Sequence, residues 1–319
     1  MKVHQWMTRF AIACVFAAFT GSAFAAQLDT DARTAIPVNV QQIIVVDYRA
    51  MQNSPAAMDL KARILPPELK ELEEALKVSG FNENHDVEEL AFAAFRTGDG
   101  ENGVRTVGIA QGQFSVPDIM ASFKKKGIKP KMIRANQLYP MGKSGMTVVF
   151  LNPTTMIFGS NDALKSALDA RDGLAPNFLS DQALVDEMGQ IDSQPLWSIL
   201  DQKGTQYMMH SLLGQASQIA DYDQVKKRLL GSYYTMNFQN GVKFSLQVNT
   251  PDTFTAATLS SLLNAAAMYE KMSGTQVEKQ AIDSTTIDSS AGDLEVNYSS
   301  SDSQFSALLQ SPLFQTVVK

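Results

Sequence analysis

The 319-residue sequence has few of the residues that most catalytic and metal sites use. It contains one cysteine, Cys14, and three histidines, and only 19% of its residues are charged. A chain with one cysteine forms no internal disulfide and offers no cysteine cluster for zinc. Acidic residues outnumber basic ones by 33 to 27, which gives a net charge of -6. Because nucleic-acid binding depends on a basic surface, we do not expect nucleic acid as the partner.

The first 25 residues have the pattern of a cleaved secretory signal peptide. Two cations, Lys2 and Arg9, precede or border the apolar run 10–19, and small residues follow up to Ala25. This run is too short to span a bilayer. Cleavage after Ala25 removes Cys14 and leaves 25 basic against 33 acidic residues, a net charge of -8. We therefore expect a periplasmic or secreted protein whose mature chain has no transmembrane helix.

The remaining sequence predicts alternating hairpins and helices. Residues 43–46 form an apolar run typical of a buried strand, and leucines at three- and four-residue spacing predict a helix over 66–80. The runs 90–97 and 104–112 flank a glycine-rich turn. That turn matches G-x-G-x-x-G, but a strand follows it, where a dinucleotide site requires a helix, so we interpret it as a hairpin loop.

The second half of the chain repeats this order. Asn240-Gly241 predicts another hairpin, and Pro251 then begins an apolar helix that extends to Met272. The segments 115–118 and 158–162 match 249–252 and 298–302 at nearly equal offsets. In each case a strand leads directly into a helix with Pro or Asp in its first turn. The pattern predicts an internal duplication.

We therefore expect the α+β class, with two related units, each a mainly antiparallel sheet with helices packed on one face. Residues 26–173 would form the first unit and residues 194–319 the second, joined by a connecting segment over 174–193.

Two groups of residues are candidates for binding. Met208, Met209 and His210 are adjacent on a predicted helix, where soft, flexible side chains are typical of an apolar groove or core. Five cations form a basic island in this acidic chain: Lys124, Lys125, Lys126, Lys129 and Lys131. The island fits an anionic membrane or another polyanion, or a solvated helix end whose lysines complement the helix dipole.

The usual catalytic and metal signatures are absent from the sequence. G-x-S-x-G, S-x-x-K followed by K-T-G, and H-E-x-x-H do not occur. His85 lies near Asp86 and Glu88, but no second histidine is close to it in sequence. We therefore expect no catalytic residue of these classes, no metal and no cofactor.

Several segments resemble exported bacterial proteins of unknown function built from tandem α+β repeats. The resemblance lies in Val87-Glu88-Glu89-Leu90 with Phe92, and in 108–114, 148–150 and 158–168. It implies an envelope location and a non-enzymatic character, and it transfers no site residue.

Three functions follow as hypotheses. The first is an exported, non-catalytic envelope protein that acts through a binding surface, with an unknown envelope protein as its partner. The alternative is a periplasmic carrier of a hydrophobic ligand, with the helix over 254–272 and with Met208 and Met209 lining a groove between helix and sheet. The third is a carboxylate-based hydrolase, because acidic residues are too common for a sequence to mark a catalytic pair.

Overall fold

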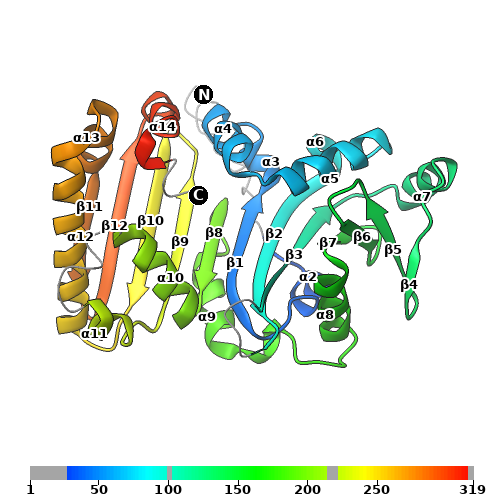
Figure 1. Ribbon diagram of the computed structural model, residues 1–319, viewed down its shortest axis with the longest axis horizontal. Helices are drawn as coiled ribbons and strands as arrows, with labels where there is room; N and C mark the ends of the chain where they lie inside the picture. The colour runs from blue at the N-terminus through cyan, green and yellow to red at the C-terminus, as the bar shows by residue number, and fades with distance from the viewer. Residues whose placement is uncertain (1–26, 99–102, 214–221, 315–319) are drawn as a thin grey trace, which may run out of the picture.

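The computed structural model describes residues 27–98, 103–213 and 222–314, and their strands form one continuous antiparallel sheet (Figure 1). The strand order is β11-β12-β10-β9-β8-β1-β2-β3-β7-β6-β5-β4. The predicted signal peptide and the tip of the glycine-rich turn, 99–102, lie outside the described residues.

The strands of the first half are β1 (Val40–Asp47), β2 (Val87–Arg96), β3 (Val104–Gly112), β4 (Lys131–Ile133), β5 (Asn136–Met141), β6 (Met146–Phe150) and β7 (Thr155–Gly159). Those of the second half are β8 (Leu196–Leu200), β9 (Gly231–Asn237), β10 (Val242–Asn249), β11 (Thr285–Ser290) and β12 (Asp293–Ser300).

The helices begin with α2 (Thr30–Thr34), α3 (Tyr48–Met51), α4 (Pro55–Ile64), α5 (Pro67–Val78), α6 (Glu83–Asp86), α7 (Val116–Lys125) and α8 (Asn161–Arg171). They continue with the short 3₁₀ turn η2 (Phe178–Ser180) and with α9 (Gln182–Ile191), α10 (Gln202–Leu213), α11 (Tyr222–Lys226), α12 (Thr253–Ser273), α13 (Gln276–Asp283) and α14 (Asp302–Leu308). Every helix in this part of the chain is too short or too polar to span a bilayer.

The two halves meet at the pair β1–β8, and five strands of each have the same order. Outward from this pair, the first half runs β1-β2-β3-β7-β6 and the second runs β8-β9-β10-β12-β11, while β5 and β4 extend the first half only. The α+β class and the antiparallel sheet are thus confirmed. The shared order agrees with the predicted duplication, which itself stays a prediction. Between the halves, the segment 174–193 contains η2 and α9, while the sheet continues across the junction through β1 and β8.

The first half carries helices on both faces of its sheet, which differs from the expected single covered face. On face A, the side of Ile43 and Trp197, α2, α8 and α9 pack in one core cluster. On face B, the side of Phe92 and Phe158, α5 and α7 pack in another. The cause lies in strands such as β2, whose alternate residues are apolar on both sides, so both faces need a cover.

The second half follows the expected pattern. Val242, Leu246 and Val248 of β10 are buried on face B, under helices that include α10, α12 and α14. The residues between them, such as Lys243 and Ser245, are exposed on face A. A sheet with one polar face needs a cover on the other face only.

Candidate functional site

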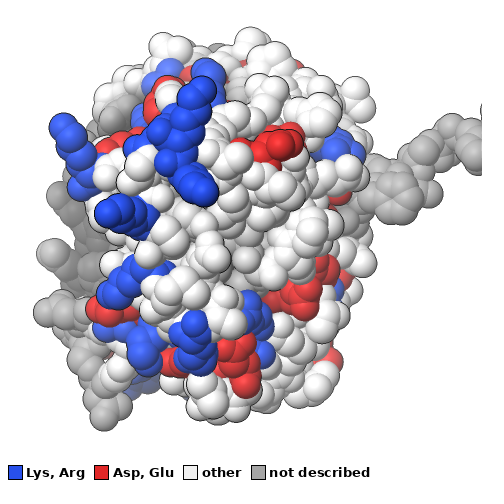
Figure 2. All heavy atoms as spheres, turned by 90° about the vertical axis from the view of Figure 1, so that its right-hand side faces the viewer, with Lys and Arg blue, Asp and Glu red and all other residues white. Residues whose placement is uncertain are grey.

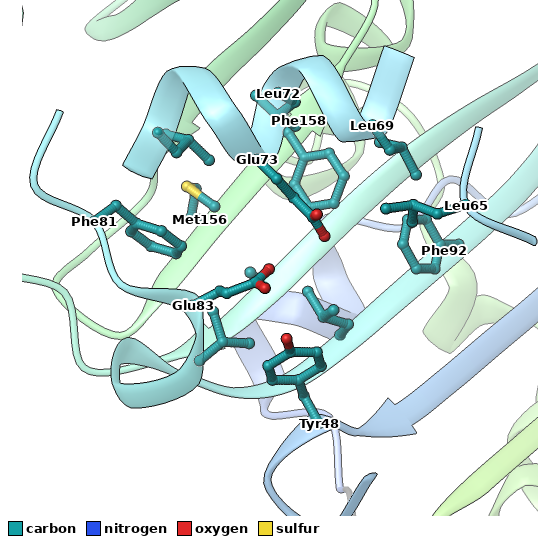
Figure 3. Close-up of a pocket in the computed structure, with 14 residues that line it drawn as sticks. Tyr48, Leu65, Leu69, Leu72, Glu73, Phe81, Glu83, Phe92, Met156 and Phe158 are labelled. Atoms are coloured by element: carbon teal, nitrogen blue, oxygen red, sulfur yellow. The ribbon is translucent and has the colours of Figure 1, made fainter. Parts of the chain in front are cut away.

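A recess lies on face B of the first half, between α5 and the strands β2, β3 and β7. Its empty space measures about 480 Å³, part of which is open to solvent. Its walls are mainly apolar, and Figure 3 shows the side chains that line it. These are Tyr48, Leu65, Leu69, Leu72, Glu73, Leu76, Phe81, Glu83, Val87, Leu90, Phe92, Ala110, Met156 and Phe158.

The helix that covers the recess is formed by local sequence signals. Pro67 occupies the first helical turn, where its missing N–H costs no hydrogen bond. Leu72 and Leu76 lie one turn apart and are buried against the sheet. Gly80 follows the helix with a φ of 93°, a conformation that glycine adopts without strain. The helix predicted over 66–80 is therefore present and forms the outer wall of the recess.

The opposite wall depends on a glycine in β3. The ring of Phe158 lies over Gly108, and a Cβ atom at this position would come within 2.1 Å of the ring. Phe158 also meets Phe92 edge-on, with ring centroids 5.9 Å apart. A larger residue at position 108 would force the Phe158 ring to move. Gly108 therefore helps to set the shape of this wall.

A polar cluster borders the recess. Lys61 Nζ is 2.8 Å from Glu73 Oε1 and 3.1 Å from Glu83 Oε2, and it donates a hydrogen bond of 3.1 Å to the Tyr48 hydroxyl. The Tyr48 hydroxyl in turn donates to Asn84 Oδ1 at 3.2 Å. In Figure 3 the oxygens of Tyr48, Glu73 and Glu83 point towards one another. The cluster thereby links α3, α4, α5 and α6.

Partial burial alters the acidity of this cluster. Burial by itself would lower the pKa of Lys61, but the hydrogen bonds to Glu73 and Tyr48 and the charge of Glu83 outweigh it, so the pKa of Lys61 is raised. Burial raises the pKa of Glu73, and repulsion from Glu83 adds to the effect of burial, while Lys61 opposes it. With one ammonium and two carboxylates, the cluster has a formal charge of -1 when both acids are ionised.

A second group of acids lies on face A, away from the recess. Burial, followed by repulsion from Asp47 on the neighbouring strand, raises the pKa of Glu89 to about 8. Glu89 Oε2 is buried and has no hydrogen-bond partner within the described ranges. Asp47 caps α3, since its Oδ1 accepts a hydrogen bond of 2.7 Å from the backbone N–H of Ala50. Asp47 therefore has a structural role.

The structure does not bring Met208, Met209 and His210 together as one lining. Met209 is fully buried in the core of the second half, Met208 is half-buried, and His210 is exposed. The His210 ring lies 6.2 Å from the ring of Tyr222. Successive residues of a helix point in different directions, which explains why adjacency in sequence does not make a site here.

The five lysines of the basic island are all exposed, around the end of α7 and the start of β4. Figure 2 looks onto this end of the molecule, where Lys and Arg side chains gather.

His85 is exposed and pairs with Asp86 at 2.9 Å, whereas Glu88 pairs with Arg49 at 2.8 Å. His85 and Glu88, which are close in sequence, therefore have different partners. Within the ranges that the structure describes, no group of three or more His, Cys, Asp or Glu side chains is arranged to hold a metal.

Sequence reasoning missed the recess and its polar cluster. The helix over 66–80 and the strands beneath it were expected, but Tyr48, Lys61, Glu73 and Glu83 carry no shared motif. These four side chains come into contact only because α3, α4, α5 and α6 fold back over the sheet. One available signal was Gly108 between two buried apolar residues of β3, Val107 and Ile109, because a glycine inside a strand often marks a close approach of another group.

Comparison with known proteins adds only a distant likeness. No family model matches the sequence, and no curated protein is recognisably similar to it. The structure titled crystal form I of TP0453 resembles this chain with a TM-score of 0.49 at 9% identity, covering 92% of this chain and 99% of that one. Crystal form III gives a TM-score of 0.49 at 9% identity, with coverages of 89% and 98%. No residue and no activity is transferred from this likeness.

Proposed function

We propose that this protein is an exported, non-catalytic binding protein that holds an apolar ligand in the recess beneath α5. The observation that carries the proposal is the composition of the recess, whose walls are mainly apolar and whose two charged side chains, Glu73 and Glu83, both contact Lys61. This arrangement is typical of sites for ligands with a hydrophobic body and one polar group. The proposal keeps the hydrophobic-carrier hypothesis but moves its site from Met208–His210 to the recess.

The size of the recess indicates how a ligand would enter. The part of the recess that water-sized molecules can occupy measures only about 50 Å³. This is much less than the 480 Å³ of its whole empty space. A ligand larger than a few waters therefore requires α5 to move outward. Moving α5 outward breaks the contacts of Leu72 and Leu76 with the sheet. Each methylene group of a ligand that moves from water into the recess contributes about 0.8 kcal/mol to the binding free energy, so a chain of several methylenes offsets this loss.

The polar cluster supports binding rather than hydrolysis. A carboxylate hydrolase needs one acid and one base that face the substrate. Glu73 and Glu83 both contact Lys61, which neutralises one of their two negative charges. We propose that the cluster holds α5 in place and meets the polar group of the ligand.

A fluorescent binding assay tests the recess. The neutral apolar probe N-phenyl-1-naphthylamine should bind the protein, and Leu69→Arg should weaken this binding at least tenfold, because it places a charge on a half-buried wall position. The matched control is Leu262→Arg, a half-buried leucine on α12 outside the recess, which should leave probe binding unchanged. Circular dichroism checks that both variants fold.

Equal loss of binding in both folded variants, or no loss in either, would overturn the proposed site. Native mass spectrometry of protein taken from its own envelope should in addition show a co-purifying apolar molecule, which Leu69→Arg lacks.

A further inference from the structure

The end of the molecule formed by α7 and β4 carries an unusual concentration of free positive charge. Four of its cations, Lys124, Lys125, Lys126 and Lys129, are exposed, and none forms an ion pair with any acid that the structure describes. The segment 119–133 contains no acidic residue. We call these four lysines the α7 patch.

Lys131 lies apart from the α7 patch. In the pairing of β4 with β5, Lys131 is opposite Leu138, which packs in the core of face A. Paired residues of neighbouring strands lie on the same side of a sheet. The pairing therefore places Lys131 on face A, whereas α7 packs on face B.

Two exposed apolar side chains accompany the α7 patch. Met132 is 55% exposed and alternates with Lys131 along β4, so it lies on the α7 side of the strand. Val78, at the end of α5, is 69% exposed. The next residue, Ser79, accepts a hydrogen bond of 3.2 Å from Lys126 Nζ, which brings the ends of α5 and α7 together.

We propose that the α7 patch docks onto the surface of an anionic bilayer, with Met132 and Val78 contacting the region between the headgroups. The net charge of the whole chain is -6, but charges more than about 10 Å apart are largely screened at 0.1 M salt. The local charge therefore governs a surface contact. This inference goes beyond the ligand proposal and stands on different residues.

Helix capping alone does not explain the patch. Lysines in the last turn of a helix complement its dipole, which accounts for Lys124 and Lys125. Lys129 lies four residues beyond the end of α7, where this effect no longer acts. A soluble polyanion would account for the lysines but not for the exposed Met132 and Val78, whereas a bilayer accounts for both.

Vesicle co-sedimentation tests the docking surface. The full mature chain should bind vesicles of phosphatidylcholine and phosphatidylglycerol more strongly than vesicles of phosphatidylcholine alone. A triple variant with Lys124, Lys125 and Lys129 changed to Ser should lose roughly a hundredfold in affinity, since each lysine near such a surface contributes about 1 kcal/mol. Lys126 is kept because of its bond to Ser79.

A second triple variant controls for net charge. Lys203, Lys227 and Lys243 are exposed lysines of the second half, and changing them to Ser alters the net charge by the same amount. This control should bind vesicles like the unaltered protein. Equal losses in the two variants would overturn the proposal.

Two further results would also overturn it. One is equal binding to neutral and anionic vesicles. The other is binding to inorganic polyphosphate without binding to anionic vesicles, which would assign the patch to a soluble polyanion. Leu69→Arg, which disrupts the recess, should leave vesicle binding unchanged, so the two proposals fail separately.

Discussion

The two halves of the sheet share a strand order but differ in where their last helix packs. In the first half, α8 follows β7 and packs on face A through Ala163, Leu164 and Leu168. In the second half, α14 follows β12 and packs on face B, where Phe305 and Leu309 meet Val242 and α4. The same local arrangement, a strand followed directly by a capped helix, thus occurs in both halves, but the helix packs on face A in one half and on face B in the other.

This difference follows from the strands beneath the helices. Face A of the first half is apolar and requires α8, whereas face A of the second half carries Lys243 and Ser245 and is left to solvent. Face B differs as well. In the second half, α10, α11 and α12 pack on it with Met209 and Leu259 in the core, while α5 leaves a mainly apolar recess in the first. Cover helices therefore follow the apolar surface of the strands.

The largest expected effect tests whether the two halves unfold together. Ile43→Ala removes a fully buried side chain of β1 that pairs with Ile199 of β8. The change should lower the free energy of unfolding by about 3 kcal/mol. Trp197 of β8 is the only tryptophan after residue 25 and packs in the same core cluster as Ile43, so its fluorescence reports on the junction of the two halves. Urea transitions followed by this fluorescence and by circular dichroism should coincide. Two separate transitions would mean that the halves are independent domains.

The second effect concerns Glu89, on face A of the first half. Its pKa is raised from 4.5 to about 8 in the folded protein, so the fold favours the protonated acid. This group therefore lowers the free energy of unfolding progressively as pH rises from about 4.5 to about 8. Glu89→Gln should remove this loss of stability. At about pH 8 the free energy of unfolding of the variant should be about 2 kcal/mol higher than that of the unaltered protein, a value that allows for solvent screening because Glu89 is partly exposed.

The control for this prediction is Glu295→Gln, at an exposed position on β12 of the second half. Urea unfolding at both ends of the pH range measures the effect. A Glu89→Gln variant with the same pH dependence as the unaltered protein would contradict the prediction.

A third prediction compares α5 and α10, which pack on face B of the first and of the second half. Lys61→Met leaves Glu73 and Glu83 facing one another without their cation. The free energy of unfolding should fall by about 1.5 kcal/mol, less than for a fully buried pair because both acids are partly exposed. Amide hydrogen exchange should become faster in α5 and stay unchanged in α10. Lys203→Met, on α10, is the control and should leave α5 unaffected. Faster exchange throughout the chain would argue against a local role of the cluster.

The smallest effect compares the starts of α8 and α14. Ser160 and Ser301 each cap a helix by accepting a hydrogen bond from a backbone N–H, at 3.3 Å in both cases. Ser160→Ala and Ser301→Ala should each cost about 1 kcal/mol. Thermal unfolding of the two variants measures this. Similar costs would show that the two helices start by the same local chemistry although they pack on opposite faces, whereas a cost at only one position would break that equivalence.

The sequence by itself determined the local elements. Leucine spacing between Pro67 and Gly80 predicted α5, and Asn240-Gly241 predicted the β9–β10 hairpin, because these signals act between residues that are close along the chain. The alternation of residues along β10 likewise separates its two faces, because successive side chains of a strand point to opposite faces, and Val242, Leu246 and Val248 are buried on one of them.

Only the tertiary structure decided which face each helix covers and where a recess remains. The expectation of a single covered face did not hold for the first half, because β2 is apolar on both sides and each side needs its own helix. Likewise, Lys61 meets Glu73 and Glu83 only because α4, α5 and α6 fold back over one sheet. Such contacts depend on the positions of elements far apart along the chain, and short-range sequence patterns carry no information on those positions.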